Sequence, residues 1–286
     1  MTPLGVLAIV GVTLSLASWL RHRWVSRRGT LQLLLAISSW VALWVASASA
    51  FATKGMTNLP LHMVSHVVVM FLVPMGLIGS AWLRSLWWLP DVVMRRRLLR
   101  WWYLGREFVL PRWLNHPLVA LVLLNVVMVL SHTPRVFDYS MSHRWVMDWA
   151  LEPAYLLSGL FFFHFLISAA PRSNRCRVRW QFVMVVATMF EMLILAMAMS
   201  IFTSTSWYSV MNAMGNTAGM SSMPGMGASI ARTFHQQQLA AAILWICGDF
   251  WAVPVLVGLV RRVSVRDGSL LAALERQSRG VTGLSS

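Results

Sequence analysis

The residues of this chain that could do chemistry are mainly histidines, and several fall where we expect one end of a helical bundle. His62 and His66 are spaced i and i+4, which places two imidazoles on one face of a helix, close enough to bind one metal ion. Two interfacial histidines that only face lipid head groups would have the same spacing. Three more candidate ligands are expected at the same end of the bundle: His132, His143 and His235.

A second group of candidate ligands consists of methionines in a stretch rich in Gly, Ser and Asn. We call this stretch the methionine loop, and its methionines are Met211, Met214, Met220, Met223 and Met226. Thioethers usually fill gaps in a hydrophobic core, and a polar loop has no such core. Neutral sulfur ligands suit Cu(I), whereas zinc and magnesium prefer thiolate, imidazole or carboxylate. The loop therefore predicts capture of Cu(I), with a loop that dips into the membrane interface as the alternative.

Acidic side chains inside apolar stretches form a third group. Glu152 is expected one helical turn into the membrane, and Glu191 and Asp249 are expected near the bilayer centre. Ionisable groups inside a membrane are costly and often mark functional paths. We therefore predict an intramembrane polar site at these three acids, with structural hydrogen bonds between helices as the alternative.

The elements that must position these residues follow from composition. The chain has 286 residues, of which 58% are hydrophobic and 12% charged, against about 45–50% and about 25% in soluble domains. An apolar stretch of about 20 residues can cross a membrane as a helix. We predict an all-α polytopic protein with one transmembrane domain (1–262) and a cytoplasmic tail (263–286). Its seven predicted spans are 3–20, 31–52, 60–82, 116–133, 148–170, 181–203 and 237–260.

The basic residues predict how the spans are oriented. All but four of the 24 Lys and Arg residues fall on one side of the predicted spans; the four are Lys54, Arg135, Arg144 and Arg232. The arginine-rich side is predicted to be cytoplasmic, with the N-terminus outside. The net charge of +15 then reflects topology and contact with membrane lipids. We expect no nucleic-acid partner.

Three motifs follow one another along residues 31–262 in a distinctive order. They are His62-x-x-x-His66, at the start of a helix that continues through Pro74; His132-Thr133-Pro134, followed by a short outer loop and Glu152; and Gln237-Gln238-Leu239-Ala240, with Trp245 in the last span. This combination resembles the seven-helix assembly factors of caa3-type cytochrome c oxidase, the CtaG family of bacilli. The chain differs from that family by Ser131, where Trp is common, and by His235-Gln236, in a stretch where Asp commonly precedes the paired glutamines.

The resemblance implies a role in maturing a haem–copper oxidase in the bacterial plasma membrane. It implies copper, expected as Cu(I), as the cargo and an oxidase catalytic subunit as the recipient. Such a protein is an assembly factor and not an enzyme. Two other functions stay open from the residues: a cytochrome with haem between histidines of different spans, and a small ion or metal transporter that uses the acids. Self-association into a homo-oligomer also stays open.

Overall fold

The computed structural model describes residues 2–21, 27–82, 116–167, 178–201 and 226–267, together with residues 93, 94, 97, 203, 207 and 208. Within these residues the chain forms helices and turns and no strand. The predicted all-α, polytopic fold is therefore confirmed. Two of the predicted segments lie outside the described residues, namely the methionine loop up to residue 225 and the tail after residue 267, as does most of the stretch 83–115 between the third and fourth predicted spans.

Six helical stretches are long and apolar enough to cross a membrane: Pro3–Leu20, Thr30–Ala48, Leu59–Gly79, Arg144–Ile167, Val178–Ser200 and Phe234–Arg261. They correspond to helix α1 (Pro3–Arg21), α2 (Arg27–Ala48), α4 with η1 and α5 (Leu59–Val67, Val68–Leu72 and Val73–Gly79), α10 with η3 and α11 (Arg144–Val146, Met147–Leu151 and Glu152–Ile167), α12 (Val178–Ser200) and α14 (Met226–Asp267). A seventh span arises if the bent pair α8 (Pro117–His132) and α9 (Pro134–Ser142) is counted as one.

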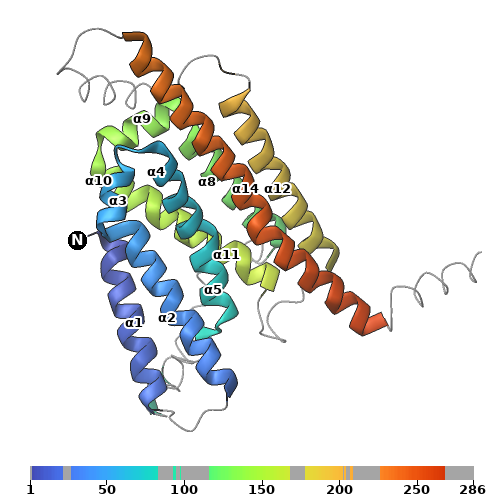
Figure 1. Ribbon diagram of the computed structural model, residues 1–286. Coiled ribbons are helices and arrows are strands. Elements are labelled where there is room, and N and C mark those ends of the chain that lie inside the picture. The colour runs from blue at the N-terminus through green and yellow to red at the C-terminus, as the bar shows by residue number, and fades with distance from the viewer. Residues whose placement is uncertain are drawn as a thin grey trace, which may run out of the picture.

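The helices alternate in direction, so their ends gather at two faces of the bundle (Figure 1). One face carries the short helix α3 (Ala50–Gly55), the start of α4, and α9. We call it the outer end, because the predicted topology puts these segments outside. The ends of α8 and α12 and the start of α14 lie at this same end, as the seven-span prediction requires.

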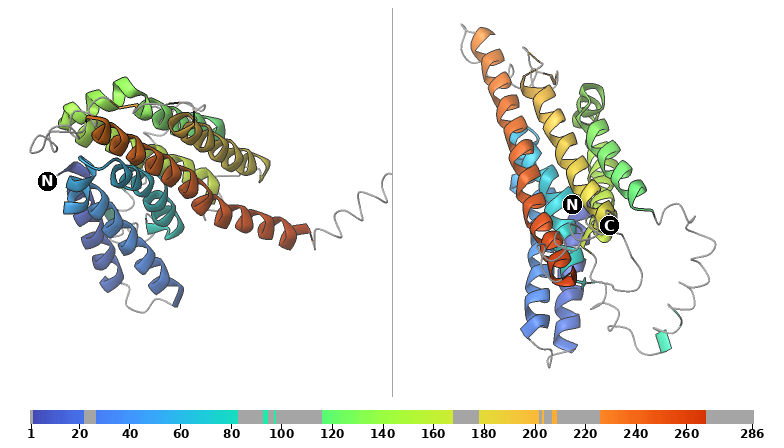
Figure 2. Two further views of the ribbon diagram at one scale, coloured as in Figure 1. Left: turned by 45° about the horizontal axis from the view of Figure 1, so that its top comes forward. Right: turned by 90° about the vertical axis from the view of Figure 1, so that its right-hand side faces the viewer.

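Packing between the helices is centred on α11 and α4. Helix α11 contacts α8 and α5, α4 contacts α14, and α14 lies along α12. The pair α1–α2 and the pair α12–α14 each run side by side in every view (Figure 2). A buried aromatic group joins α14 to the centre of the bundle through Trp251, whose ring stacks 5.2 Å from Phe71 and lies 5.8 Å from Phe162.

Two features differ from the predicted secondary structure. The segment after span 4 is not a loop but helix α9, which leaves α8 at an angle of 73°. Thr133 has an extended backbone and precedes Pro134, and the residue before a proline disfavours helical geometry. In addition, η1 and η3 are π-helical turns inside spans 3 and 5. At η1 the carbonyl of Met70 lies so close to α11 that only glycine fits at Gly159.

Candidate metal centre

The paired histidines lie on the first two turns of α4, at the outer end. Asn58 caps this helix, since its Oδ1 accepts a hydrogen bond from the backbone N–H of Leu61 at 3.1 Å, and Pro60 occupies the first turn, where proline is tolerated. The rings of His62 and His66 lie 4.1 Å apart. Both side chains are buried, with 5% and 7% of their surface exposed. The predicted pair therefore shares one helical face, and that face points into the bundle.

A third imidazole reaches the pair from α8. His132 lies on the last turn of that helix, 3% exposed, and its ring centre is 6.0 Å from that of His66. Its Nδ1 lies 2.7 Å from the carbonyl oxygen of Met128. Because a carbonyl can only accept, Nδ1 carries the proton and Nε2 keeps a free lone pair. This arrangement fixes the tautomer and the direction of a metal-binding nitrogen.

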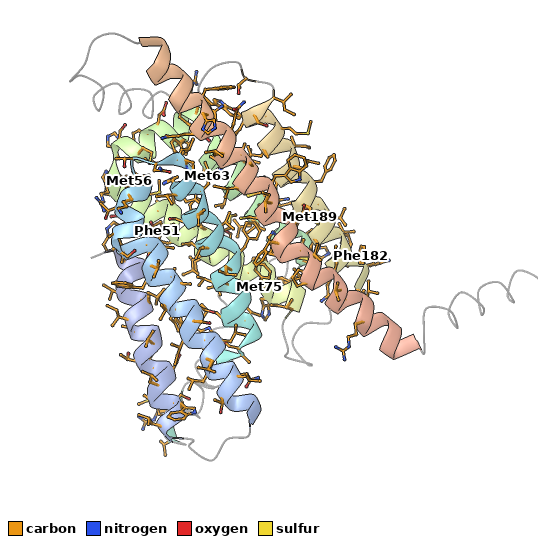
Figure 3. The ribbon with its side chains drawn as sticks, in the orientation of Figure 1. Phe51, Met56, Met63, Met75, Phe182 and Met189 are labelled. Atoms are coloured by element: carbon orange, nitrogen blue, oxygen red, sulfur yellow. The ribbon has the colours of Figure 1, made fainter. Side chains whose placement is uncertain are left out.

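The lone pair of His132 faces a sulfur atom. Its Nε2 lies 3.2 Å from the Sδ atom of Met63, which projects from α4 into the bundle and is 1% exposed (Figure 3). Met63 stands next to His62 in the sequence. Three imidazoles and one thioether thus gather between α4 and α8, and we call these four residues the histidine–methionine cluster.

Several nitrogens of the cluster are buried without a partner. Nε2 of His62 and both ring nitrogens of His66 make no hydrogen bond within the described part of the chain. Buried polar atoms in proteins are nearly always paired, and a bound ion could pair with one nitrogen of each ring. Among the described residues, no three His, Cys, Asp or Glu side chains already converge on one metal position. The Met63 sulfur is a further candidate donor beside the three imidazoles.

Aromatic rings cover the cluster. Phe137 of α9 meets the ring of His62 edge-on at 5.3 Å, and Tyr208 lies on Phe137 with ring centres 3.9 Å apart. Tyr155 of α11 packs against His66 at 4.5 Å. Burial raises the pKa of the Tyr208 hydroxyl well above its ordinary value of 10.0. The hydroxyl therefore stays protonated and donates to the backbone carbonyl of His132 at 3.3 Å.

Gln237 holds this aromatic cover in place from α14. The side chain is fully buried, and its Nε2 donates to the carbonyl of Met199 at 2.7 Å and to Oγ1 of Thr203 at 3.2 Å. Its Oε1 accepts a hydrogen bond from the backbone N–H of Trp207 at 2.6 Å. One amide therefore fixes the end of α12 and the backbone next to Tyr208.

The family model described as cytochrome c oxidase caa3 assembly factor (Caa3_CtaG) matches residues 13–265. The chain belongs to this family. The predicted resemblance is thereby confirmed, and the match includes every residue of the histidine–methionine cluster and of its aromatic cover. No curated protein and no solved structure matches the chain.

This caa3 assembly factor does not bring all the predicted ligands together. His143 and His235 are exposed, at the junction of α9 and α10 and on α14. His235 is two residues from the buried Gln237, which puts it on nearly the opposite face of the helix. The methionine loop lies outside the described residues, apart from the backbone of Met226 in α14. Its role and those of His143 and His235 stay predictions.

None of the three predicted acids forms a hydrogen bond or ion pair with the histidine–methionine cluster within the described residues. Glu152 begins α11 and Glu191 lies on α12; each is partly buried and has a carboxylate oxygen with no hydrogen-bond partner among the described residues. Asp249 is exposed on α14. Within the described residues, no two of these acids contact each other or share a hydrogen-bond partner. An intramembrane polar site therefore stays a prediction.

Sequence reasoning missed the sulfur donor and the cover in this assembly factor. Met63 stands between the paired histidines, and a methionine in an apolar helix is typical of core packing. Phe137, Tyr155 and Tyr208 likewise have no motif that would single them out. Gln237 belongs to one of the motifs that resemble the family, but only the structure reveals its three hydrogen bonds.

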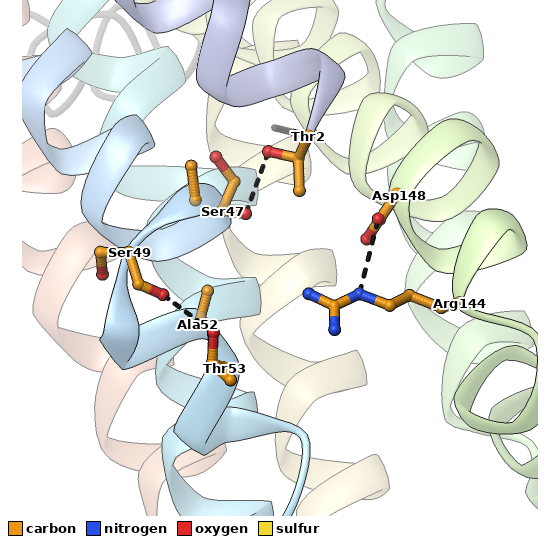
Figure 4. A pocket seen from close by; sticks show the side chains of 8 residues that line it. Thr2, Ser47, Ser49, Ala52, Thr53, Arg144 and Asp148 are labelled. Carbon is orange, nitrogen blue, oxygen red and sulfur yellow. Dashed lines mark hydrogen bonds and ion pairs between the residues drawn. The ribbon is translucent and has the colours of Figure 1, made fainter.

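The outer end of this caa3 assembly factor also contains a polar cavity of about 330 Å³, away from the histidines (Figure 4). It lies where α1, α2 and α3 meet α10 and η3. The Nε atom of Arg144 pairs with Oδ2 of Asp148 at 3.7 Å along its wall. The hydroxyl of Thr2 closes another side by donating to the carbonyl of Ser47 at 3.1 Å. Asp148, which the sequence places at a helix start, is thus a structural partner of Arg144.

Proposed function

We propose that this assembly factor binds Cu(I) in the histidine–methionine cluster and delivers it to the catalytic subunit of the oxidase in the bacterial plasma membrane. The observation that carries the proposal is the group of buried, unpaired imidazole nitrogens next to a thioether. The family supplies the context of oxidase assembly. Copper is the cargo here, so a site that binds it must also release it.

The donor set favours Cu(I) over other metals. Imidazole and thioether are neutral, and thioether is a soft ligand that selects Cu(I). Zinc sites normally add thiolate or carboxylate, and magnesium and calcium sites are built from oxygens. A neutral donor set in a buried pocket also suits a cation of single charge, because burying a higher charge without a counter-charge costs more.

A route from the methionine loop to the cluster is short along the chain. Met211 follows Tyr208 by three residues, a reach of at most about 11 Å. Tyr208 itself lies against Phe137, which covers His62. Cu(I) caught by the loop would therefore arrive at the aromatic cover, and transfer would proceed by exchanging thioether for imidazole ligands. The oxidation state does not change and no covalent bond forms.

The two other functions find less support. A haem with two axial histidines needs them on opposite sides of the iron, yet His62 and His66 share one helical face. An iron bound to His132 would have to lie next to its Nε2, and the sulfur of Met63 already occupies that position. A transporter that uses the acids would need them to line one path. Within the described residues, no contact joins Glu191 to the exposed Asp249.

Metal analysis of the purified protein tests the proposal. We expect Cu(I) bound by the wild type and lost from His62→Ala and His66→Ala. His143→Ala and His235→Ala are matched controls, since these exposed histidines lie outside the cluster, and they should keep their copper. Oxidase from a strain that carries only the His66→Ala protein should contain less copper than oxidase from the control strains. Full copper binding and full oxidase copper with both cluster variants would overturn the proposal.

A further inference from the structure

Helix α14 presents a carboxylate, without a partner among the described residues, to the outside of the bundle in the middle of its membrane span. The span runs from Phe234 to Arg261, and Asp249 lies near its centre. Its side chain is exposed and makes no hydrogen bond or ion pair with any described residue. The surrounding surface would be covered by lipid tails, which have no donor to offer a carboxylate.

The residues around Asp249 form a continuous apolar stripe at helical spacing. Large, well exposed side chains lie one turn before it, directly after it, and one and two turns after it: Trp245 54%, Ile246 67%, Phe250 70%, Val253 52% and Val257 62%. The opposite face of α14 is buried against α4 and α12. The stripe is therefore a helix face that the bundle itself does not use.

We propose that this face, with Asp249 at its centre, docks a transmembrane helix of another membrane protein that carries a lysine or arginine at matching depth. Ionisable groups in a membrane are almost always paired or face a polar path. A carboxylate set among Trp245, Phe250 and Val253 fits a partner helix whose cation pairs with Asp249 while its apolar side chains cover the stripe.

A basic partner is favoured over a second copy of the chain by charge. Within the described residues, the acids near mid-span are Glu152, Glu191 and Asp249, and no lysine or arginine lies at that depth. Basic side chains such as Lys54, Arg144 and Arg261 lie at or beyond the ends of spans. A second copy would therefore bring like charge to the same depth.

The docking face lies one helix away from the histidine–methionine cluster. The buried side of α14 contacts α4, which carries His62, Met63 and His66. The buried side of α14 also carries Gln237, which fixes the backbone next to Tyr208. A partner on the exposed side of α14 would thus be held close to the cluster without taking part in metal binding, so the inference stands apart from the proposed function.

Photocrosslinking in native membranes tests the docking face. A benzophenone amino acid replaces Phe250, and a control carries it at Leu157, which is equally exposed, at 63%, on α11. We expect a discrete protein adduct from position 250 and none from 157, and we expect the crosslinked peptide to be a transmembrane segment that contains Lys or Arg. Adding Asp249→Leu should lower the adduct yield by about three- to fifteenfold, the range for a single polar contact between membrane helices.

Charge exchange provides the second measurement. Asp249→Lys should abolish the adduct, and replacing the partner's basic residue by Asp should restore it. Because Asp249 is exposed, Asp249→Leu should fold normally and bind copper as the wild type does, which separates this test from that of the proposed function. Adducts only with lipid or with a second copy, a partner segment without a basic residue, no adduct at all, or a yield unchanged by Asp249→Leu would each overturn the inference.

Discussion

Replacing Met63 by leucine is the sharpest test of the donor set, because it removes one sulfur atom and little else. Leucine and methionine have similar volumes, and such exchanges in a core usually cost less than about 1.5 kcal/mol. Met63 Sδ lies 3.2 Å from Nε2 of His132. Metal–nitrogen and metal–sulfur bonds in zinc proteins are about 2.0 Å and about 2.3 Å long, so two atoms at this separation lie within reach of one ion. The two atoms can therefore bind one ion as they stand.

The expected loss of affinity follows from the number of donors. Changing a residue that only orients a ligand typically lowers metal affinity by about 10- to 100-fold. Losing a donor should cost at least about tenfold, which is about 1.4 kcal/mol. The assay is anaerobic competition between the purified protein and a Cu(I) chelator. Met184→Leu is the matched control, because Met184 is also fully buried but lies near the opposite end of the bundle, on α12. Equal Cu(I) affinities for the two leucine variants would refute Met63 as a ligand.

Three further predictions test the elements around the cluster. Gln237→Leu removes the acceptor of the Trp207 N–H and one of the two donors to the Met199 carbonyl, which keeps its bond from Thr203, and thermal unfolding in detergent should show a loss of about 1–3 kcal/mol; an unchanged midpoint would contradict the role of this amide. Gly159→Ala places a methyl group against the carbonyl of Met70 and should destabilise by about 1–3 kcal/mol, whereas Gly258→Ala, which meets open space, serves as its control. Changing all five methionines of the methionine loop to leucine should leave insertion normal but raise the external copper needed for active oxidase; wild-type growth under copper limitation would remove the loop from copper capture.

Much of the fold could be predicted because the membrane requires long apolar helices. Apolar stretches of the sequence coincide with helices of the structure, as Pro3–Arg21 and Pro117–His132 illustrate. Helix α9 could not be found in this way, since the segment Pro134–Ser142 is short and half polar. The π-helical turns have no sequence signature either, because they arise where packing against a neighbouring helix shifts the backbone.

The histidine–methionine cluster could be predicted from the sequence only in part, for a physical reason. Hydropathy gives the depth of a residue in the membrane but not the direction in which its helix face points. His62, His66 and His132 share both depth and direction, and they meet. His143 and His235 were assigned to the same end of the bundle, yet both are exposed. Met63 could not be singled out because a methionine in an apolar helix is typical of core packing. Its sulfur becomes a candidate donor only because its helix face points toward His132.

Helix α8 has a consequence for the thickness of the surrounding membrane. Its sixteen residues make it about 24 Å long at 1.5 Å per residue, whereas the hydrocarbon core of a bilayer is about 30 Å thick. The helix ends at His132 and the chain then turns by 73° into α9. A span shorter than the hydrocarbon core is matched by local thinning of the bilayer, and thinning beside α8 would bring water closer to His132 than an average bilayer does. Lipids with longer acyl chains should oppose this thinning, so the rate at which copper reaches the cluster is expected to fall as the bilayer becomes thicker.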